Sequence, residues 1–432
     1  MAVFIFCRMV VTVFFEVTMF AGSGNFLGSR DSASGGEIGV LFTKAFVKVS
    51  RYFMDHYLEN PTESVWQNIC SYFLELSVSN CALRLKDGFT QSNAKQQNLM
   101  TNYRVAIIGG DGIGPEVISE ALKVVAASGV KLATTNFDLG GARYLRDGEI
   151  LSDSTLSELR EFDAILLGAV GTPAVPPGVI ERGLLLKIRF ELDLYINLRP
   201  FSGVGPGQTK PHDFIVIREN TEGPYVGEGG VLRRGTVHEV ATQGSVNTAK
   251  GVERCVRFAF ELAMTRKRKH LTLVHKTNVL TFAGDLWQRT FDRVAQEFTE
   301  VVTGYNHIDA ACIYFVQDPH RYDVIVTDNL FGDILTDLGG AVSGGIGVAS
   351  SANLNPARNG PSMFEPVHGS APDIAGKGVA NPVAAILSAA HMLEFLGEEK
   401  AANVLRVACE KSVTGSTTAV GDEIAKRVKA SI

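Results

Sequence analysis

The sequence has little cysteine, and the cysteines it has are scattered. Six cysteines occur in 432 residues, and none forms a Cys-x-x-Cys pair. Without such spacing, neither a cysteine-ligated metal site nor a disulfide framework is indicated. We therefore expect a reducing, cytoplasmic setting with unpaired thiols at Cys7, Cys70, Cys81, Cys255, Cys312 and Cys409.

An excess of basic charge is also missing. The chain has 41 lysines and arginines against 46 acidic residues, which gives a formal net charge of −5. Binding to nucleic acid or to an anionic membrane needs a basic face, so neither is expected as a partner. The apolar share of 45% and the charged share of 20% are ordinary for a globular protein. With nucleic acid and membrane not expected as partners, we expect a small molecule as the ligand.

No uninterrupted apolar run is long enough to cross a membrane, which takes about 20 residues. Residues 1–22 are apolar, but Arg8 and Glu16 interrupt them. In a signal peptide the basic residue would precede the apolar run, whereas Arg8 lies inside it. From Ser23 to Leu99 the sequence contains no sustained period and no recognisable motif, so we leave the N-terminal extension 1–99 unassigned.

The character of the sequence changes at Met100, where MTNYRVAIIGGDGIGPE begins. Our hypothesis is that Met100 is the true start, or at least the start of the functional part. The alternative, a real targeting or interaction segment, stays open. A peptide from residues 1–90 in mass spectrometry of the natural protein would contradict the hypothesis.

From Tyr103 onward, short apolar runs alternate with amphipathic stretches, a pattern that predicts an α/β protein. No internal repeat or low-complexity tract is present. Strands are predicted at 104–110, 131–138, 164–170, 213–219, 271–276 and 322–328. Helices are predicted from Pro115, from Ser152, up to about Leu194, and at 248–265, 285–298, 329–338 and 380–397.

The glycine turn GGDGIGPE (109–116) imitates a dinucleotide-binding fingerprint. A Gly-x-Gly that starts at Gly110 needs a third glycine where Pro115 stands, so the spacing does not fit a Rossmann domain. A tight strand-to-helix turn is the better interpretation. Such a turn could still line a cofactor cleft.

The stretch NLFGDILTDL (329–338) carries the clearest chemical signal. Asp333 and Asp337 are four residues apart, so both carboxylates project from one helical face. Their neighbours Ile334, Leu335 and Leu338 are apolar, where a surface position would favour lysine or arginine. Paired carboxylates in such a helix indicate a hard divalent cation, Mg²⁺ or Mn²⁺.

Cationic residues next to apolar runs give a second signal. Arg189, Arg199 and Arg218 are candidate fork-shaped donors for carboxylates, although a single such arginine is more often part of a structural ion pair. Lys276 ends a predicted strand, and ligands gather at the carboxyl ends of strands in open α/β sheets. The glycine- and proline-rich loop at 365–382 is long enough to be functional.

Taken together, these stretches resemble the β-decarboxylating dehydrogenase family, which contains the isocitrate and isopropylmalate dehydrogenases. The resemblance covers the chain from Tyr103 to the C-terminus. It rests on motifs in the family's order: GGDGIGPE, ERGLLLKIR, NLRP, RENTEGPY, VHKTNVL, NHIDA, NLFGDILTDL and EPVHGSAPDIAGKGVANP.

The resemblance implies a two-domain isopropylmalate/isocitrate dehydrogenase-like fold that is not a Rossmann fold. A large cofactor-binding domain is expected from 101–194 plus 344–432. A smaller domain, 195–343, is expected to carry the dimer interface and the metal and substrate residues, with the active site in the interdomain cleft. The resemblance also implies a homodimer with shared active sites, in which Lys276 and Asp309 come from the second subunit.

For chemistry, the resemblance implies NAD-dependent oxidation and decarboxylation of a 2-hydroxy diacid, as in leucine biosynthesis. Lys276 is expected as the base and Tyr225 as the acid. The metal is expected on Asp309, Asp333 and Asp337. Substrate contacts are expected from Arg189, Arg199, Arg218, Asp309, Glu181, Leu184 and Leu185.

Cofactor contacts are also implied. Asp373 matches the position that binds the adenosine ribose, and an acidic side chain there repels a 2′-phosphate, which favours NAD over NADP. NADP-using relatives have lysine and tyrosine at the positions of Asp373 and Ile374. The full set of expected cofactor residues is Glu365, His368, Gly369, Ser370, Ala371, Asp373, Ile374 and Asn381.

Substrate choice depends on the apolar patch Leu184–Leu186, which suits an isopropyl group and therefore favours 3-isopropylmalate. D-malate and tartrate dehydrogenases of the same family remain alternatives. A catalytically silent regulatory subunit is a further alternative, but such subunits typically lose the acid, the base or an aspartate. This chain keeps Tyr225, Lys276 and all three aspartates.

Overall fold

The computed structural model describes residues 102–204 and 210–432. The expectations for residues 1–99, for Met100 and for the first three cysteines lie outside this part. From Leu99 to Ile432 the chain forms one compact unit. Within the described ranges, no helix combines the length and the apolar character needed to span a membrane.

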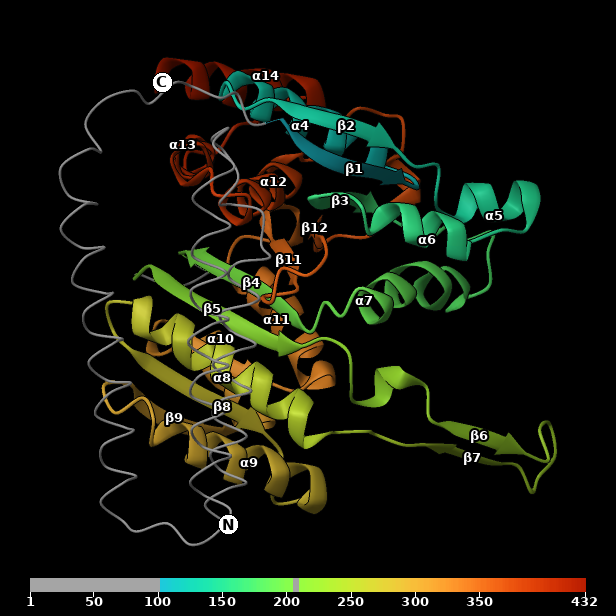
Figure 1. Cartoon of the computed structure of the whole chain (residues 1–432), viewed down its shortest axis with the longest axis vertical. Coiled ribbons are helices and arrows are strands. Elements are labelled where there is room, and N and C mark those ends of the chain that lie inside the picture. Colours follow the sequence, from blue (N-terminus) through green and yellow to red (C-terminus); the bar gives the residue numbers. More distant parts are fainter. Residues whose placement is uncertain (1–101, 205–209) are drawn as a thin grey trace, which may run out of the picture. The chain divides into compact units, whose positions relative to one another are not determined.

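A ten-stranded mixed sheet forms the centre of this unit (Figure 1). Its strand order is β2-β1-β3-β12-β11-β4-β5-β10-β8-β9, and a separate hairpin, β6–β7, projects away from it. The strands are β1 (Tyr103–Gly110), β2 (Leu132–Asn136), β3 (Ala164–Ala169), β4 (Ile196–Gly203), β5 (His212–Glu219), β6 (Gly229–Leu232), β7 (Val240–Gln243), β8 (His270–His275), β9 (Val302–His307), β10 (Val324–Thr327), β11 (Ser350–Leu354) and β12 (Ser362–Pro366).

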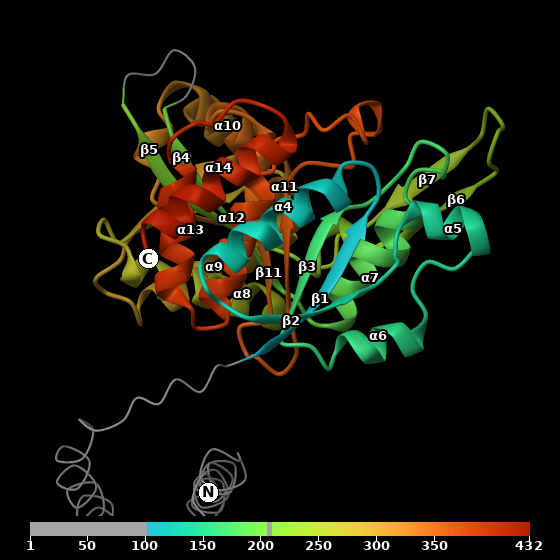
Figure 2. The ribbon, with the colours of Figure 1, turned by 90° about the horizontal axis from the view of Figure 1, so that it is seen from above.

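Helices connect most of these strands and pack on the sheet (Figure 2). The α-helices are α4 (Gly114–Ala127), α5 (Gly141–Asp147), α6 (Asp153–Leu159), α7 (Lys187–Glu191), α8 (Ala249–Thr265), α9 (Thr281–Ala295), α10 (Ile308–Gln317), α11 (Asn329–Val342), α12 (Val383–Phe395), α13 (Glu399–Cys409) and α14 (Thr417–Ala430). A π-helix, η1 (Glu181–Leu186), precedes α7, and short 3₁₀ turns are η2 (Pro224–Val226), η3 (Pro319–Arg321), η4 (Ile346–Val348) and η5 (Pro372–Ile374).

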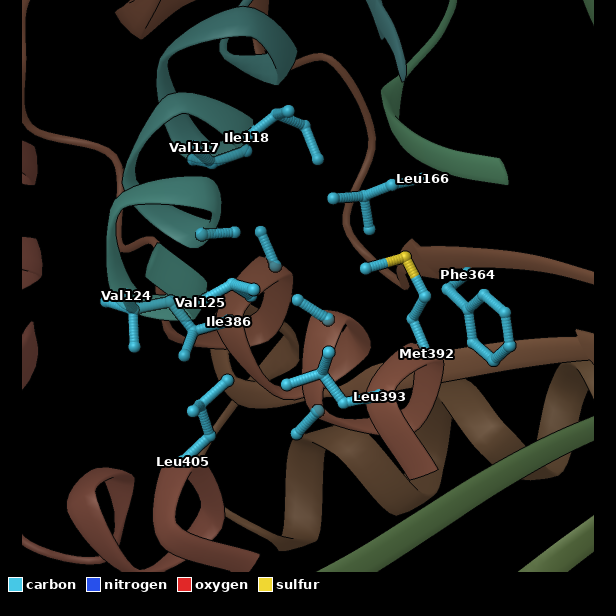
Figure 3. Packing of buried hydrophobic residues seen from close by; sticks show 14 of the residues in the cluster. Val117, Ile118, Val124, Val125, Leu166, Phe364, Ile386, Met392, Leu393 and Leu405 are labelled. Carbon is cyan, nitrogen blue, oxygen red and sulfur yellow. The ribbon is translucent and has the colours of Figure 1, made fainter. Parts of the chain in front are cut away.

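The continuous apolar runs of the strands have a simple explanation. Val105 and Ile107 of β1 pack into one buried cluster, while Ala106 and Ile108 pack into another on the opposite face. Because successive side chains point to opposite faces, a strand that is covered on both sides must be apolar throughout. Figure 3 shows part of the first of these clusters, which gathers apolar side chains of α4, α12 and α13 together with Leu166 of β3 and Phe364 of β12.

The sheet is assembled from two sets of five strands. Strands β1, β2, β3, β11 and β12 lie on one side, and β4, β5, β8, β9 and β10 lie on the other. The two sets meet where β11 pairs with β4 in an antiparallel ladder of three residue pairs: Ala352 with Leu198, Asn353 with Asn197, and Leu354 with Ile196. The expected division into two domains with a cleft remains a prediction, since the described chain forms one compact unit.

The α/β class is confirmed, and the strand order with antiparallel β11 and β4 is not that of a Rossmann domain. The helix predicted at 285–298 is observed as Thr281–Ala295, and the one predicted up to Leu194 ends at Glu191. Strands β4, β9, β11 and β12 of the sheet and the hairpin strands β6 and β7 were not predicted. The sequences of the four missed sheet strands, INLRPFSG, VTGYNH, SSANL and SMFEP, contain polar residues or proline where a buried strand normally has an apolar run.

Candidate active site

The two predicted carboxylates lie one turn apart on α11. The helix begins after Asp328, whose side chain caps it by accepting a hydrogen bond from the Phe331 amide. Asp337 keeps contact with solvent, and its partial desolvation together with the negative charge of Asp333 raises its pKa. The two groups therefore repel each other across one helical face, which is the situation that a bound cation would relieve.

Three arginines from three different elements lie close to one another, and two of them, Arg199 and Arg218, pair with Asp333. Arg189 of α7, Arg199 of β4 and Arg218 of β5 are all buried, with at most 6% of each residue exposed. Arg218 forms an ion pair with Asp333 and donates from Nε to Asn329 Oδ1 at 2.9 Å. Gly332 makes this approach possible, because a Cβ there would lie 2.4 Å from Arg218 Cγ.

Arg199 contacts both a hydroxyl and a carboxylate group of α11. Its Nη1 donates to Thr336 Oγ1 at 2.5 Å and lies 4.0 Å from Asp333 Oδ1. Burial and the positive charges of Arg218 and Arg189 lower the pKa of Arg199 to about 10. The group still carries its charge at neutral pH, but an additional anion would stabilise it.

Arg189 forms an ion pair with Glu365 of β12, in which Arg189 Nη2 donates a hydrogen bond to Glu365 Oε1 at 2.8 Å. The Nε atoms of Arg189 and Arg199 are buried and have no hydrogen-bond partner among the residues that the structure describes. Three guanidinium groups thus face two carboxylates, Asp333 and Glu365, with which they form ion pairs. Buried positive charge with unpaired donors is suited to binding a carboxylate ligand.

Tyr225 extends this cluster. It lies in the 3₁₀ turn η2, and its hydroxyl donates to Asp333 Oδ2 at 2.7 Å. The Arg218 guanidinium lies 5.2 Å from the centre of its ring. Burial raises the pKa of Tyr225 despite the nearby Arg218 charge, so its hydroxyl stays protonated at neutral pH and can give a proton.

Lys276 and Asp309 form a second, separate pair. Lys276 follows β8, Asp309 opens α10, and Lys276 Nζ donates to Asp309 Oδ1 at 2.8 Å. This hydrogen bond lowers the pKa of Asp309. In the described part of the chain, no group of three or more histidine, cysteine, aspartate or glutamate side chains is arranged to hold a metal. Asp309 therefore does not join Asp333 and Asp337 within one copy.

Two distant turns meet where the cofactor is expected. The Ile113 amide, in the turn between β1 and α4, donates to Ser370 O at 2.9 Å. Gly112 has φ +58°, and a Cβ there would lie 1.9 Å from the same oxygen. The turn predicted from GGDGIGPE is thus confirmed as a tight strand-to-helix turn, and only glycine fits at Gly112.

The rest of the loop after β12 presents polar groups to a ligand. His368 is 8% exposed, and its Nε2 is buried without a hydrogen-bond partner in the described part of the chain. Burial lowers the pKa of His368, which keeps the ring neutral and able to accept or donate a hydrogen bond. Asp373 lies exposed in η5, Ile374 is half-buried behind it, and exposed Asn381 accepts from the Val383 amide at 3.1 Å.

The leucines expected to read the substrate side chain differ in access. They lie on η1, and π-helical turns are frequent at functional sites. Leu184 is fully buried in the cluster that also contains Ile108 and Leu167. Leu185 is partly exposed, so of the two it has the surface that a ligand can reach. Glu181 is exposed and accepts from the Gly178 amide at 2.9 Å.

Two residues of the cluster were not predicted, although the sequence contained a signal for them. Asn329 and Thr336 accept hydrogen bonds from Arg218 and Arg199. They lie four residues before and three residues after Asp333, which is the spacing of one helical face. The role of Glu365 as the partner of Arg189 had no such local signal.

A family model for isocitrate/isopropylmalate dehydrogenase matches residues 104–430, more than half of the chain. The chain belongs to the isocitrate/isopropylmalate dehydrogenase family. Relatives named 3-isopropylmalate dehydrogenase include those of Corynebacterium efficiens, 60% identical over 76% of this chain and 100% of the relative, and of Nocardia farcinica, 60% identical over 75% and 100%.

Solved structures give the same family. An isocitrate dehydrogenase from Methylococcus capsulatus superposes with a TM-score of 0.70 at 36% identity, covering 76% of this chain and 99% of that one. A β-decarboxylating dehydrogenase from Thermococcus kodakarensis gives a TM-score of 0.64 at 38% identity, covering 76% and 96%. The family expected from the motifs is therefore confirmed.

Proposed function

We propose that this chain oxidises and decarboxylates (2R,3S)-3-isopropylmalate to 4-methyl-2-oxopentanoate and CO₂ with NAD, a reaction of leucine biosynthesis. The observation that carries the proposal is the cluster of buried Arg189, Arg199 and Arg218, which has more positive charge than its carboxylate partners neutralise. Relatives at about 60% identity that bear the name 3-isopropylmalate dehydrogenase support this choice of substrate.

In this mechanism the three arginines hold the two carboxylates of the substrate. Charge-assisted hydrogen bonds from guanidinium groups fix both the position and the orientation of a carboxylate. The Nε atoms of Arg189 and Arg199 are buried without a partner among the described residues, so both arginines have hydrogen-bonding capacity that their protein partners do not use. Held in this way, the diacid presents its C2 hydroxyl toward the face of α11 that carries Asp333 and Asp337.

The donor set on α11 fits a hard divalent cation, because Asp333 and Asp337 are oxygen ligands that repel each other. Asp309 would complete the set from a second copy of the chain. When bound, Mg²⁺ or Mn²⁺ would polarise the C2 oxygen and stabilise enolate charge, while NAD would accept the hydride from C2. Exposed Asp373 suits the ribose hydroxyls of NAD and disfavours the 2′-phosphate of NADP.

Proton transfer then falls to two side chains of this chain. Lys276 takes the proton of the C2 hydroxyl, directly or through a water, as hydride leaves C2. Loss of CO₂ from the resulting β-keto acid leaves an enolate, and Tyr225 gives its proton to C3. The protonated state of Tyr225, favoured by burial, suits it to this role.

The proposal includes a homodimer in which Lys276 and Asp309 reach the site of a second copy, because Asp309 does not join Asp333 and Asp337 in a metal-binding group within the described part of one copy. Apolar side chains on α10 and α11 are available for such an interface. Ile313, Leu330 and Ile334 are 54%, 38% and 48% exposed. Burying exposed apolar surface of this kind is what stabilises subunit association.

The expected cytoplasmic location stays part of the proposal, and the three described cysteines, Cys255, Cys312 and Cys409, are free.

D-malate and tartrate remain the alternative substrates, because the arginines contact only the malate core that all three compounds share. The partly exposed Leu185 favours the isopropyl group. A silent regulatory subunit is disfavoured, because Tyr225 and Lys276 are both present.

The deciding experiment is a steady-state assay of purified protein. It compares 3-isopropylmalate, D-malate, tartrate and isocitrate, each with NAD and with NADP, with and without Mg²⁺. We expect the highest kcat/KM for 3-isopropylmalate with NAD and Mg²⁺. A higher kcat/KM for D-malate than for 3-isopropylmalate would contradict the proposed substrate. Full activity in the presence of a chelator would contradict the metal-dependent mechanism.

A further inference from the structure

A set of fully buried side-chain amides, which the proposed mechanism does not use, is connected to Arg189 through Glu365. Asn353 of β11, Asn197 of β4 and Asn220, directly after β5, are each 0% exposed. A buried amide costs free energy unless it is hydrogen-bonded, and each of these three donates from its NH2 group to a buried acceptor. The Oδ1 atoms of Asn197 and Asn220 have no partner among the described residues, so the hydrogen bonds to Asn353 are what orients these two amides. The three residues lie on both sides of the ladder between β11 and β4.

Asn353 is the centre of this set. Its Oδ1 accepts from Asn197 Nδ2 and from Asn220 Nδ2, both at 2.9 Å. Two donors on the oxygen fix the orientation of the amide, so Nδ2 must point the other way. There it donates to Glu365 Oε1 at 2.8 Å.

Glu365 Oε1 is also the atom that accepts from Arg189 Nη2 at 2.8 Å. One carboxylate oxygen is thus shared between Asn353 and Arg189. An arginine and a carboxylate that are free to turn favour a bidentate pair with two parallel hydrogen bonds. Here the pair has a single hydrogen bond, and Arg189 Nε is buried without a partner within residues 102–204 and 210–432.

We propose that Asn353 is a positioning residue for substrate binding. By holding Glu365, it limits the Arg189–Glu365 pair to one hydrogen bond, which orients the guanidinium group and leaves Arg189 with donor capacity for the substrate carboxylate. This inference rests on the proposed role of Arg189 in binding a diacid. Through Asn220, the first residue after β5, the same amide also anchors the start of the loop that leads to Tyr225.

The test compares Asn353→Ala with Asn355→Ala as a matched control. Asn355 is 2% exposed and lies two residues further along the chain, but its amide donates to Leu192 O and Asn359 Oδ1 and not to Glu365. Both changes remove a buried amide, so both should lower stability. Only Asn353→Ala should release Glu365 to pair fully with Arg189.

We expect Asn353→Ala to raise the KM for 3-isopropylmalate about 5- to 30-fold, as for one lost hydrogen bond, with a smaller effect on kcat. Asn355→Ala should leave this KM within about twofold of the wild-type value. In a Glu365→Gln background, Asn353→Ala should have little further effect on KM, because Asn353 acts through Glu365. A KM change no larger than that of the control would overturn the inference.

Calorimetric titration with 3-isopropylmalate and Mg²⁺, without NAD, separates this inference from the proposed reaction. A wild-type protein that binds the diacid but does not turn it over would overturn the reaction, while the Asn353→Ala comparison would still be decided by Kd. A wild-type protein that does not bind it would overturn both. If Asn353→Ala does not fold, Asn353→Ser, which retains a hydroxyl donor, provides the same comparison with a smaller expected shift.

Discussion

Asp333 and Asp337 are both carboxylates on one face of α11, but their surroundings shift their pKa values in opposite directions. Burial alone would raise the pKa of Asp333, yet the Arg218 charge, the Tyr225 hydrogen bond and the Arg199 charge together hold it below its usual value. The pKa of Asp337 is raised instead, by burial and by Asp333. Asp337 is therefore the carboxylate that gains most when a cation arrives.

Replacing Asp337 with asparagine should weaken metal binding, because it removes one charged ligand and leaves the Asp333 ion pairs intact. We expect a 10- to 100-fold rise in the Mg²⁺ or Mn²⁺ concentration for half-maximal activity, as for the loss of one charge-assisted bond. Metal titrations of activity and of binding would measure it. Asp422→Asn, at an exposed carboxylate on α14 that pairs with Lys123, is the control and should change neither.

Glu219, next to Arg218, should make stability depend on pH. Burial raises its pKa to about 7 from the ordinary 4.5, although Thr221 and the Glu222 amide donate hydrogen bonds to its carboxylate. The folded chain therefore binds more protons than the unfolded chain between these values. The stabilisation from the protonated form is complete below pH 4.5 and is lost as the pH rises through about 7.

Glu219→Gln removes this titration. Relative to the variant, the wild-type protein should lose up to about 3 kcal/mol of unfolding free energy between pH 4.5 and pH 8. Denaturant unfolding of both proteins at several pH values measures the difference. Parallel pH profiles for the two proteins would contradict the prediction.

At the scale of elements, the contact between the β1–α4 turn and the loop after β12 determines the geometry of the expected cofactor site. A side chain at Gly112 would be forced into Ser370 O, at 1.9 Å, in addition to the strain of a positive φ. Gly129, at the end of α4, offers a comparison, because it also has a positive φ but no atom within 4 Å of its ideal Cβ position.

Gly112→Ala should therefore raise the KM for NAD, while Gly129→Ala should not. Both variants carry the backbone penalty of about 1 kcal/mol for a left-handed residue, which thermal unfolding would register. Initial rates at varied NAD and saturating diacid would measure the specific effect. Equal NAD KM values for the two variants would show that the turn does not shape the cofactor site.

The features that could be predicted from the sequence are those whose partners are close along the chain. Asp333 and Asp337 were placed on one helical face correctly, because a spacing of four residues is local information. Strand β11, SSANL, was missed because Ser351 and Asn353 are polar yet fully buried. Their stabilising partner Asn197 lies about 150 residues away along the chain, and no local pattern reveals it.

The same limit applied to the site. The family resemblance named Arg189 and Glu365 as substrate and cofactor residues, but their ion pair joins positions 176 residues apart. Leu184 and Leu185 look alike in sequence, and only the packing of η1 shows that one is core and the other reaches the surface.

At the scale of the whole molecule, the proposed dimer makes a sharp prediction about mixtures. A Lys276→Ala chain keeps Asp333, and an Asp333→Asn chain keeps Lys276, so each alone should be nearly inactive. If sites are shared, a mixed dimer has one site with both residues intact. Equal amounts, allowed to exchange subunits, should recover roughly a quarter of wild-type activity by random pairing.

Activity of the mixture is measured after refolding the two variants together and, as a control, after refolding them separately and combining them without exchange. Recovery only in the first case supports shared sites. No recovery despite proven exchange would mean that each copy builds its own site.

The ladder between β11 and β4 has a mechanical meaning as well as a topological one. Ten strands form one sheet, yet its two sets of five are joined in it by only three residue pairs. Because the two sets share so short a ladder within the sheet, we expect any rotation of one set against the other to be concentrated at these three pairs. Asn353 lies at the middle pair, so we expect its side-chain hydrogen bonds to resist such a rotation.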